Sequence, residues 1–260
     1  MGTITKALDM LNFFSRTKGQ IGLGEFVRLS GRDKATVHRH LVELEANGFL
    51  SQDPLSRAYH MGPAILRLAS VREATNPLRI TLKPIITALS QEVGELAHAS
   101  LLQGHVLSPV FNADPGVHGT QVHFDEAELL PLHATSSGIA VLAFSPPEFR
   151  NEVLARPATR FTSHTITDAT ALAKLIADVR RTGISRLART FDEEVASQAA
   201  AIFDSSGAVI GALAVAVPAT RAKPDRLDTI ARVLLPAAMD ITRALSGQYP
   251  DLDAALEPGK

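Results

Sequence analysis

Residues 24–48 contain two short amphipathic segments joined by a turn that includes Gly31. In the second segment, the apolar positions that recur at i, i+4 and i+7 are Val37, Leu41 and Leu44. This spacing places them on one stripe of an α-helix. Asp33 directly precedes the segment and is expected to cap its N-terminus. The pattern predicts a helix-turn-helix.

The other face of the second segment begins with cations and short polar side chains, namely Lys34, Thr36, His38, Arg39 and His40. In helix-turn-helix proteins the N-terminal end of the second helix enters the DNA major groove. Basic side chains there contact phosphates, and short polar side chains reach base edges. A hairpin used only for packing has no need for this cluster, although many solvated helices carry such charges. The segment therefore predicts DNA binding.

Two strand-like segments follow this pair of helices, at residues 49–52 and 58–61. Residues 53–57 between them, Asp-Pro-Leu-Ser-Arg, have the composition of a turn. A helix followed at once by a hairpin is typical of a winged helix-turn-helix. Arg57 lies near the tip of this hairpin, where it is placed to touch the DNA backbone or minor groove. A helix over residues 4–15 completes the predicted domain.

From residue 62 onward, the sequence has the pattern of mixed helices and strands. Gly62-Pro63 begins a helix that Asn76-Pro77 ends, because proline disfavours helix in the residue before it. Further helices are expected at 78–93, at 132–144, beginning with residues 146–148, at 169–181 and at 224–245. Strands are expected at 98–102, 106–111, 122–124, 199–203 and 209–217. Strands flanked by helices at both ends predict an α+β ligand-binding domain on an antiparallel sheet.

The composition is that of a globular protein and bears on its location. Of the 260 residues, 45% are hydrophobic and 20% are charged. The chain has no apolar run long enough for a membrane span and no N-terminal pattern of a secretory signal. It contains no cysteine, which excludes disulfides and thiolate chemistry. We therefore expect a cytoplasmic protein.

The net charge of −1 conceals an asymmetry between the two parts of the chain. Residues 1–75 hold ten Lys and Arg and seven Asp and Glu, a balance of +3. Residues 76–260 have a balance of −4. A basic DNA-reading domain on an acidic body has the expected sign. Because each neutralised phosphate adds to the affinity for DNA, the small surplus of positive charge predicts that two or more such domains bind DNA together.

Six segments of the chain stand in a characteristic order and spacing. They are ITKALDMLNFF (4–14), DKATVHRHLVELEANGFLSQD (33–53), YHMGPAILRLAS (59–70), LPLHATSSG (130–138), FTSHTITDATAL (161–172) and AIFDSSGAVIGALAVAVP (201–218). Together they resemble the IclR family of bacterial transcriptional regulators, over about residues 4–246.

The resemblance implies an α+β architecture in which a winged helix-turn-helix is joined by a linker helix to an effector-binding domain. The effector-binding domain of this family is an antiparallel-sheet domain similar to the GAF fold. The expected parts are the DNA-binding domain at 1–62, the linker helix at 63–76, the effector-binding domain at 77–247 and a frayed tail at 248–260.

The resemblance also implies how the protein meets DNA. Lys34, Thr36, His38 and Arg39 would face the DNA, with Arg57 in the wing. Members bind palindromic operators as dimers or dimers of dimers, so a homodimer or homotetramer is expected. The prediction is a ligand-responsive transcriptional regulator, acting as a repressor, with a small-molecule effector and no cofactor.

The effector pocket implied by the resemblance comprises Val122, Ser136, Ser137, Gly138, Leu187, Ser197, Ala214 and Ala216. Members that bind very small carboxylates have an acidic residue in place of Leu187, cysteine in place of Ser197, and serine in place of Ala214 and Ala216. Three of these four differences remove polar groups that a tiny charged acid would need. The hypothesis is a larger, partly apolar organic acid such as an aromatic acid. The serine hydroxyls and helix-start N–H groups near Gly138 would hold its polar end.

Nine histidines raise an enzymatic alternative. None has the spacing of an HxH or HExxH motif, so scattered surface or core histidines are the simpler interpretation and no metal site is predicted. Residues 136–138, Ser-Ser-Gly, do not form a GxSxG nucleophile motif. A hydrolase-like enzyme, which would turn over a candidate ligand, stays an alternative. So does a DNA-binding protein without an effector, whose DNA affinity would ignore every metabolite.

Overall fold

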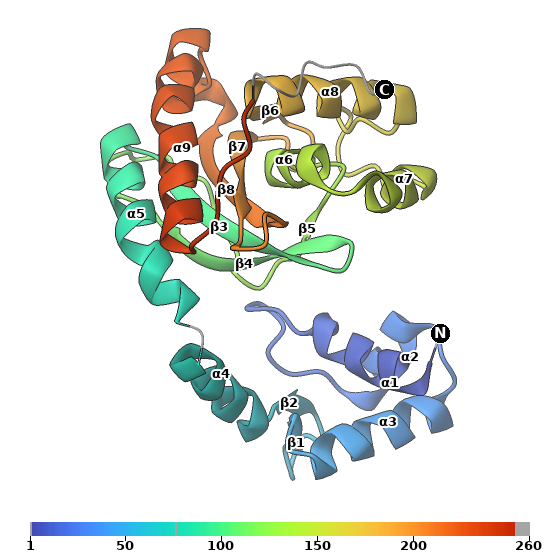
Figure 1. The fold of residues 1–260 in the computed structure, drawn as a ribbon. Coiled ribbons are helices and arrows are strands. Elements are labelled where there is room, and N and C mark those ends of the chain that lie inside the picture. The colour runs from blue at the N-terminus through green and yellow to red at the C-terminus, as the bar shows by residue number, and fades with distance from the viewer. Residues whose placement is uncertain (1, 76, 253–260) are drawn as a thin grey trace. The chain divides into compact units, whose positions relative to one another are not determined.

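The computed structural model describes residues 2–75 and 77–252 (Figure 1). The chain divides into two compact units, residues 1–78 and 79–260, each with its own hydrophobic core. The predictions for residue 76 and for the 253–260 part of the tail lie outside the described residues.

The first unit is a winged helix-turn-helix. In chain order its elements are α1 (Thr3–Leu8), the 3₁₀ helix η1 (Asp9–Phe13), α2 (Leu23–Ser30), α3 (Lys34–Ala46), β1 (Leu50–Gln52), β2 (Tyr59–Met61) and α4 (Pro63–Thr75). The predicted helix over residues 4–15 is wrong beyond Leu8, where the chain tightens into η1. Met10 of η1 is completely buried and packs in one core with Phe26.

The turn between α2 and α3 follows the predicted chemistry. Gly31 ends α2 in a left-handed conformation with φ of 63°, which glycine adopts without steric cost. The side chain of Asp33 accepts a hydrogen bond from the backbone N–H of Thr36 at 2.9 Å, so it caps α3 as expected. Val37 and Leu41 on α3 are completely buried. The start of α3 is therefore fixed relative to the core that carries it.

The second unit contains a six-stranded antiparallel sheet with the strand order β5-β4-β3-β8-β7-β6. The strands are β3 (Leu96–Gln103), β4 (Val106–Ala113), β5 (Leu130–Pro131), β6 (Ser185–Ala188), β7 (Val195–Phe203) and β8 (Val209–Pro218). The strand predicted at 122–124 is wrong, because the chain between β4 and β5 is irregular there. The short strands β5 and β6 were not predicted.

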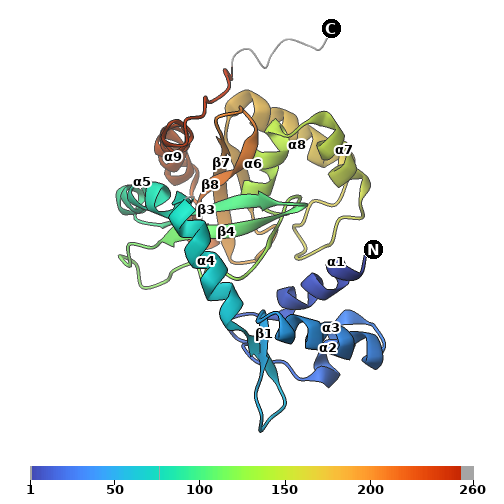
Figure 2. The same cartoon turned by 60° about the horizontal axis from the view of Figure 1, so that its bottom comes forward.

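Helices cover both faces of this sheet (Figures 1 and 2). On one face lie α5 (Leu78–Val93) and α9 (Pro224–Ala244); on the other lie α6 (Ser136–Phe144), α7 (Pro147–Ala155) and α8 (Ala169–Thr182). A short 3₁₀ helix, η2 (Ala219–Arg221), follows β8. As predicted, Asp168 caps the start of α8 and Gly183 ends it with φ of 76°.

The tail predicted to be frayed from Gln248 is packed at its start. The ring of Tyr249 makes edge contacts with Phe144 and Phe203, with centroids 6.3 and 5.0 Å apart. Aromatic pairs in this arrangement add to the stability gained from burial. Tyr249 therefore belongs to the edge of the sheet core.

Helix α6 is the most deeply buried helix of the sheet domain. Residues 136–143 are all buried, and the helix packs against β7 and β8. The strand positions beneath it are small, at Ala199, Ala201, Ala212 and Ala214. Gly138 permits an equally close approach at the start of the helix, since a Cβ there would lie 2.3 Å from the backbone oxygen of Leu132.

We predict that Gly138→Ala destabilises the second unit by about 1–3 kcal/mol, the usual cost of overpacking a well-packed site. The matched control is Gly119→Ala, because a Cβ at Gly119 meets no atom within 4 Å. Urea denaturation followed by circular dichroism measures both free energies of unfolding. Equal stability of the two variants would contradict the close packing at Gly138.

Candidate functional site

The DNA-facing residues predicted from the sequence lie together on the first unit. Lys34, His38 and Arg39 are exposed at the N-terminal half of α3, and Thr36 is partly exposed beside them. The buried stripe on the opposite side of α3 holds the helix against its own core. α3 thus presents cations and a hydroxyl on one free face, as a major-groove reading helix does.

His40 was expected on this polar face, and that expectation is wrong. Its side chain is only 3% exposed, and neither ring nitrogen has a hydrogen-bond partner among the residues the structure describes. Burial, together with the nearby charges of Arg39 and Arg32, lowers the pKa of His40. Position 40 falls one helical turn after Val37 and next to Leu41, so the sequence period itself places it towards the core.

Arg57 lies in the turn of the wing and is exposed. It adopts φ of 60°, which is uncommon for a residue other than glycine. Its carbonyl accepts a hydrogen bond from the Gln52 side chain at 2.9 Å, and its N–H donates to the Asp53 carbonyl at 2.9 Å. Asp53 also accepts hydrogen bonds from Leu55 and Ser56, so the turn that carries Arg57 is held by its own backbone and side chains.

The second unit contains a cavity of about 90 Å³ on the α6 side of the sheet. Its wall comes from the sheet, the start of α6, the segment between β4 and β5, and the segment between β6 and β7. The lining residues are His98, Val122, His123, Phe124, Asp125, Glu128, Leu130, Ala134, Thr135, Ser136, Ser137, Leu187, Thr190, Phe191, Asp192, Val195, Ser197 and Ala216.

Six of the eight residues predicted for the effector pocket line this cavity. They are Val122, Ser136, Ser137, Leu187, Ser197 and Ala216. Gly138 and Ala214 do not line it. Gly138 packs against Leu132, and its N–H donates to the Thr135 hydroxyl at 3.1 Å. Ala214 is buried beneath α6 as part of the sheet core.

Strand register explains why residues far apart in sequence meet here. Leu187 of β6 pairs with Ser197 of β7, and Ser197 pairs with Ala216 of β8. Directly paired residues of neighbouring strands project to the same face of a sheet. The hydroxyl of Ser136, at the start of α6, then donates to Ser197 Oγ at 2.7 Å. This hydrogen bond joins the helix to the sheet at the cavity wall.

Several lining residues were not predicted, and His98 is the most informative of them. It is 5% exposed, lies on β3 opposite Ala214, and its ring is 4.4 Å from the ring of Phe124. Burial lowers the pKa of His98 to about 4, so the imidazole is neutral near pH 7. The sequence predicted a strand that includes His98, but it did not show that this strand pairs with β8.

The segment between β4 and β5 is anchored by a buried carboxylate. Glu95, which is almost completely buried, accepts hydrogen bonds from Arg221 Nε at 3.0 Å and Nη2 at 2.7 Å. Arg221 Nη1 also donates to the Thr120 carbonyl at 2.7 Å. Arg226 and His118 lie 3.6 and 3.8 Å from the same carboxylate. A paired, bidentate geometry of this kind compensates the cost of burying the charge.

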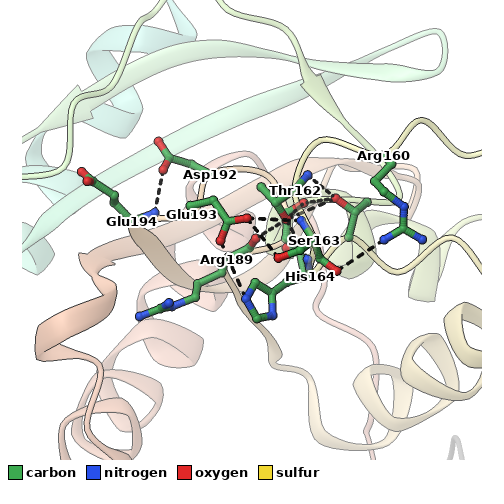
Figure 3. A network of polar contacts seen from close by, with 10 residues as sticks. Arg160, Thr162, Ser163, His164, Arg189, Asp192, Glu193 and Glu194 are labelled. Carbon is green, nitrogen blue, oxygen red and sulfur yellow. Dashed lines mark hydrogen bonds and ion pairs between the residues drawn. The ribbon is translucent and has the colours of Figure 1, made fainter.

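A second polar network fixes the segment that carries Thr190, Phe191 and Asp192 (Figure 3). The hydroxyls of Thr162 and Thr165 donate to the carbonyls of Arg189 and Thr190, and the Thr165 bond measures 2.7 Å. Thr190 Oγ1 donates to the Ala134 carbonyl at 2.7 Å, just before α6. Residues 161–165, FTSHT, thus position one wall of the cavity.

Ser163 extends this network to the acidic run at 192–194. Its N–H and hydroxyl both lie 3.2 Å from a Glu193 carboxylate oxygen, and His164 lies 3.7 Å from the other oxygen (Figure 3). Glu194 donates its N–H to Asp192 at 2.8 Å. The acidic run is therefore a hydrogen-bonded turn at the cavity edge.

We predict that Thr165→Val costs about 1–3 kcal/mol of stability. The variant removes the shorter hydroxyl donor of the Thr190 carbonyl, at 2.7 Å, and the acceptor of the Phe161 and Thr162 backbone N–H groups. Thr170→Val, at an exposed position of α8, is the matched control. Thermal unfolding compares the two variants. An unfolding temperature of Thr165→Val equal to that of Thr170→Val would show that the network does not hold this wall.

Within residues 2–75 and 77–252, no group of three or more His, Asp or Glu side chains has the arrangement of a metal site. In the same residues, no helix is both long and apolar enough to cross a membrane.

A winged helix-turn-helix followed by an antiparallel-sheet domain with a cavity beside the sheet is the arrangement of two-domain transcriptional regulators. Residues 3–54 match the family model described as the IclR helix-turn-helix domain, and residues 74–243 match the model of the bacterial transcriptional regulator IclR C-terminal domain. The chain belongs to the IclR family. Members of this family are DNA-binding transcriptional regulators and not enzymes.

Relatives and solved structures agree with this membership over nearly the full chain. The HTH-type transcriptional regulator BhcR of Paracoccus denitrificans is 28% identical over 96% of this chain and 88% of its own length. The crystal structure of an IclR-type regulator from Silicibacter sp. TM1040 is 43% identical, with 96% and 99% coverage and a TM-score of 0.88. A structure of an IclR homologue from Microbacterium hydrocarbonoxydans in complex with 4-hydroxybenzoate is 24% identical, with 94% and 99% coverage and a TM-score of 0.75.

Proposed function

We propose that this regulator responds to a small organic ligand bound in the cavity beside α6, and that it acts as a repressor at a palindromic operator. The observation that carries the proposal is the cavity itself, which gathers residues of five strands, one helix start and two connecting segments. Small-molecule sites are concave and largely apolar, with a few convergent polar groups, and this cavity has that make-up. The cytoplasm is the proposed location.

The proposed ligand has a partly apolar body. Val122, Phe124, Leu187 and Phe191 supply apolar walls, and the Ser197 hydroxyl lies among them. The complex of the Microbacterium homologue with 4-hydroxybenzoate supports an aromatic ring as one candidate body. The acidic end expected from the sequence has weaker support, because no Lys or Arg lines the cavity among the described residues.

We propose that α3 and the wing contact operator DNA through Lys34, Thr36, His38, Arg39 and Arg57. We also propose a homodimer or a dimer of dimers, because a palindromic site presents two equivalent half-sites. Exposed apolar side chains on α4, at Leu66, Leu68 and Val71, support association between copies. A ligand changes operator affinity only as far as it binds the two quaternary states differently.

Arg39→Ala is expected to weaken operator binding by about 1–3 kcal/mol if Arg39 reads a base, while leaving ligand binding intact. The control is Arg243→Ala, which removes an exposed arginine of the second unit that pairs with Asp240. Fluorescence anisotropy with labelled DNA from upstream of the protein's own gene gives both affinities. Unchanged operator affinity of Arg39→Ala would remove Arg39 from the interface.

Ser197→Leu is expected to abolish the ligand response and to spare operator binding, because the larger side chain fills the cavity. The matched control is Thr170→Leu at an exposed position of α8. The same anisotropy assay, repeated with a panel of aromatic and small aliphatic compounds, measures the response. If no compound alters the operator affinity of the unsubstituted protein, the DNA-binding protein without an effector becomes the better description.

A further inference from the structure

The second unit has another concave site, a groove at the opposite end of α6 from the cavity. The cavity is lined by Ser136 and Ser137 at the start of the helix, and the groove by Phe144 at its end. α7 and α8 lie beside α6 here (Figures 1 and 2) and supply two further walls. The groove measures about 530 Å³, within the roughly 300–1,000 Å³ of small-molecule sites.

The charged lining of this groove is entirely positive. Among the described residues, Arg150 of α7 and Arg180 of α8 line it, and no Asp or Glu does. The chain from residue 76 onward has a charge balance of −4. Two arginines without a facing carboxylate therefore run against the charge of the unit that carries them. Such a groove attracts anions.

Arg150 has no partner within the protein. It is only partly exposed, and its side chain makes no hydrogen bond or ion pair with any residue that the structure describes. Glu152, the acid two residues further along α7, is engaged elsewhere: it lies 2.6 Å from Arg156 and 3.1 Å from His105. A partly desolvated guanidinium without an acceptor gains from an anionic ligand.

Arg180 is held in position at the end of α6. Its Nη1 donates to the Ala143 carbonyl at 3.0 Å, and its guanidinium carbon lies 5.9 Å from the centroid of the Phe144 ring. A cation at a helix C-terminus is favourable, so this contact also stabilises α6. Nε and Nη2 of Arg180 have no partner among the described residues. They remain available to a ligand.

The remaining walls are largely apolar and are fixed by neighbouring elements. They include Leu102 of β3, Phe149 of α7 and Val209 of β8. The ring of Phe149 stacks on that of His105 in the turn between β3 and β4, with centroids 5.3 Å apart and an interplanar angle of 11°. This stacking ties α7, and Arg150 with it, to the sheet.

We infer that this groove is a second ligand site, which binds an organic acid. Arg150 binds its carboxylate, Arg180 adds a second cation, and the apolar body lies against Phe149 and Val209. Guanidinium groups suit carboxylates because they offer parallel N–H donors. A small inorganic anion would leave the apolar walls uncovered, and an amine would meet two like charges. The inference does not depend on the proposed function of the cavity.

Two matched sets of probes separate charge from shape. The first set is 3-phenylpropionate, 3-phenylpropan-1-ol and 3-phenylpropylamine; the second is hexanoate, hexan-1-ol and hexylamine. Isothermal titration of each probe into the full-length protein, without DNA, measures its affinity. The acid of at least one set should bind at least about tenfold more tightly than its alcohol, with the amine weakest.

Glutamine variants test whether the two arginines are responsible. Arg150→Gln, which loses no contact within the protein, should reduce the acid affinity about tenfold or more and leave the alcohol affinity nearly unchanged. Arg180→Gln should act in the same direction, and circular dichroism checks that α6 survives the loss of its contact. Arg181→Gln is the matched control, because Arg181 is exposed beside Arg180, pairs with Asp178 and does not line the groove.

Ser197→Leu separates the groove from the cavity. This variant fills the cavity at the start of α6, so acid binding in the groove should survive it. Acid binding that Ser197→Leu abolishes and Arg150→Gln leaves unchanged would place the acid in the cavity. That result would overturn the inference while supporting the proposed function.

The inference would also be overturned if neither acid bound at millimolar concentrations, or if the acids bound no more tightly than their alcohols. Failure of the proposed function has a different signature. It would appear as the absence of selective DNA binding, or as operator affinity that no compound changes, whatever the groove binds.

Discussion

The second unit depends on the close approach of α6 to the central strands of the sheet. Small side chains on β7 and β8, and a glycine near the start of the helix, allow this approach. The position of α6 in turn sets the hydrogen bond between Ser136 and Ser197 and one wall of the cavity. A larger side chain under the helix would change the shape of the cavity as well as the packing of the core.

Elements governed by local chemistry were predictable from the sequence. The N-caps at Asp33 and Asp168, and the glycine that ends α8, act within a few residues of the helices they bound. The 3₁₀ turn after Leu8 and the burial of His40 were not predicted. The 3₁₀ turn follows from packing against other elements, which the local pattern of polar and apolar residues does not encode. The burial of His40 agrees with the helical period of Val37 and Leu41, but a polar side chain there favoured the exposed face. The short strands β5 and β6 exist only because longer strands provide their partners.

The same distinction applies to the cavity. Six expected residues meet there because strand register and the start of α6 bring them together. Asp125, Glu128 and Asp192 come from irregular segments, whose paths are set by side-chain hydrogen bonds and not by a repeating pattern. The charged residues of the cavity lining were therefore the part of the site least accessible from sequence.

The anchoring of Thr120 by Arg221 has a consequence for the kinetics of ligand exchange. Arg221 holds the Thr120 carbonyl and neutralises the buried Glu95 at the same time, so releasing the chain at Thr120 would disturb a buried ion pair. β5 fixes the other end of the segment by its pairing with β4. The stretch 121–129 lies between these two anchors, and within it only the hydrogen bond from Asn112 Nδ2 to Glu126 at 2.6 Å ties it by a side chain to β4 among the described contacts. We therefore expect this stretch to be the part that yields when a ligand enters or leaves. The residence time of the ligand would then depend on how readily this stretch opens. The sheet and α6 would keep the rest of the binding surface in the same conformation with and without ligand.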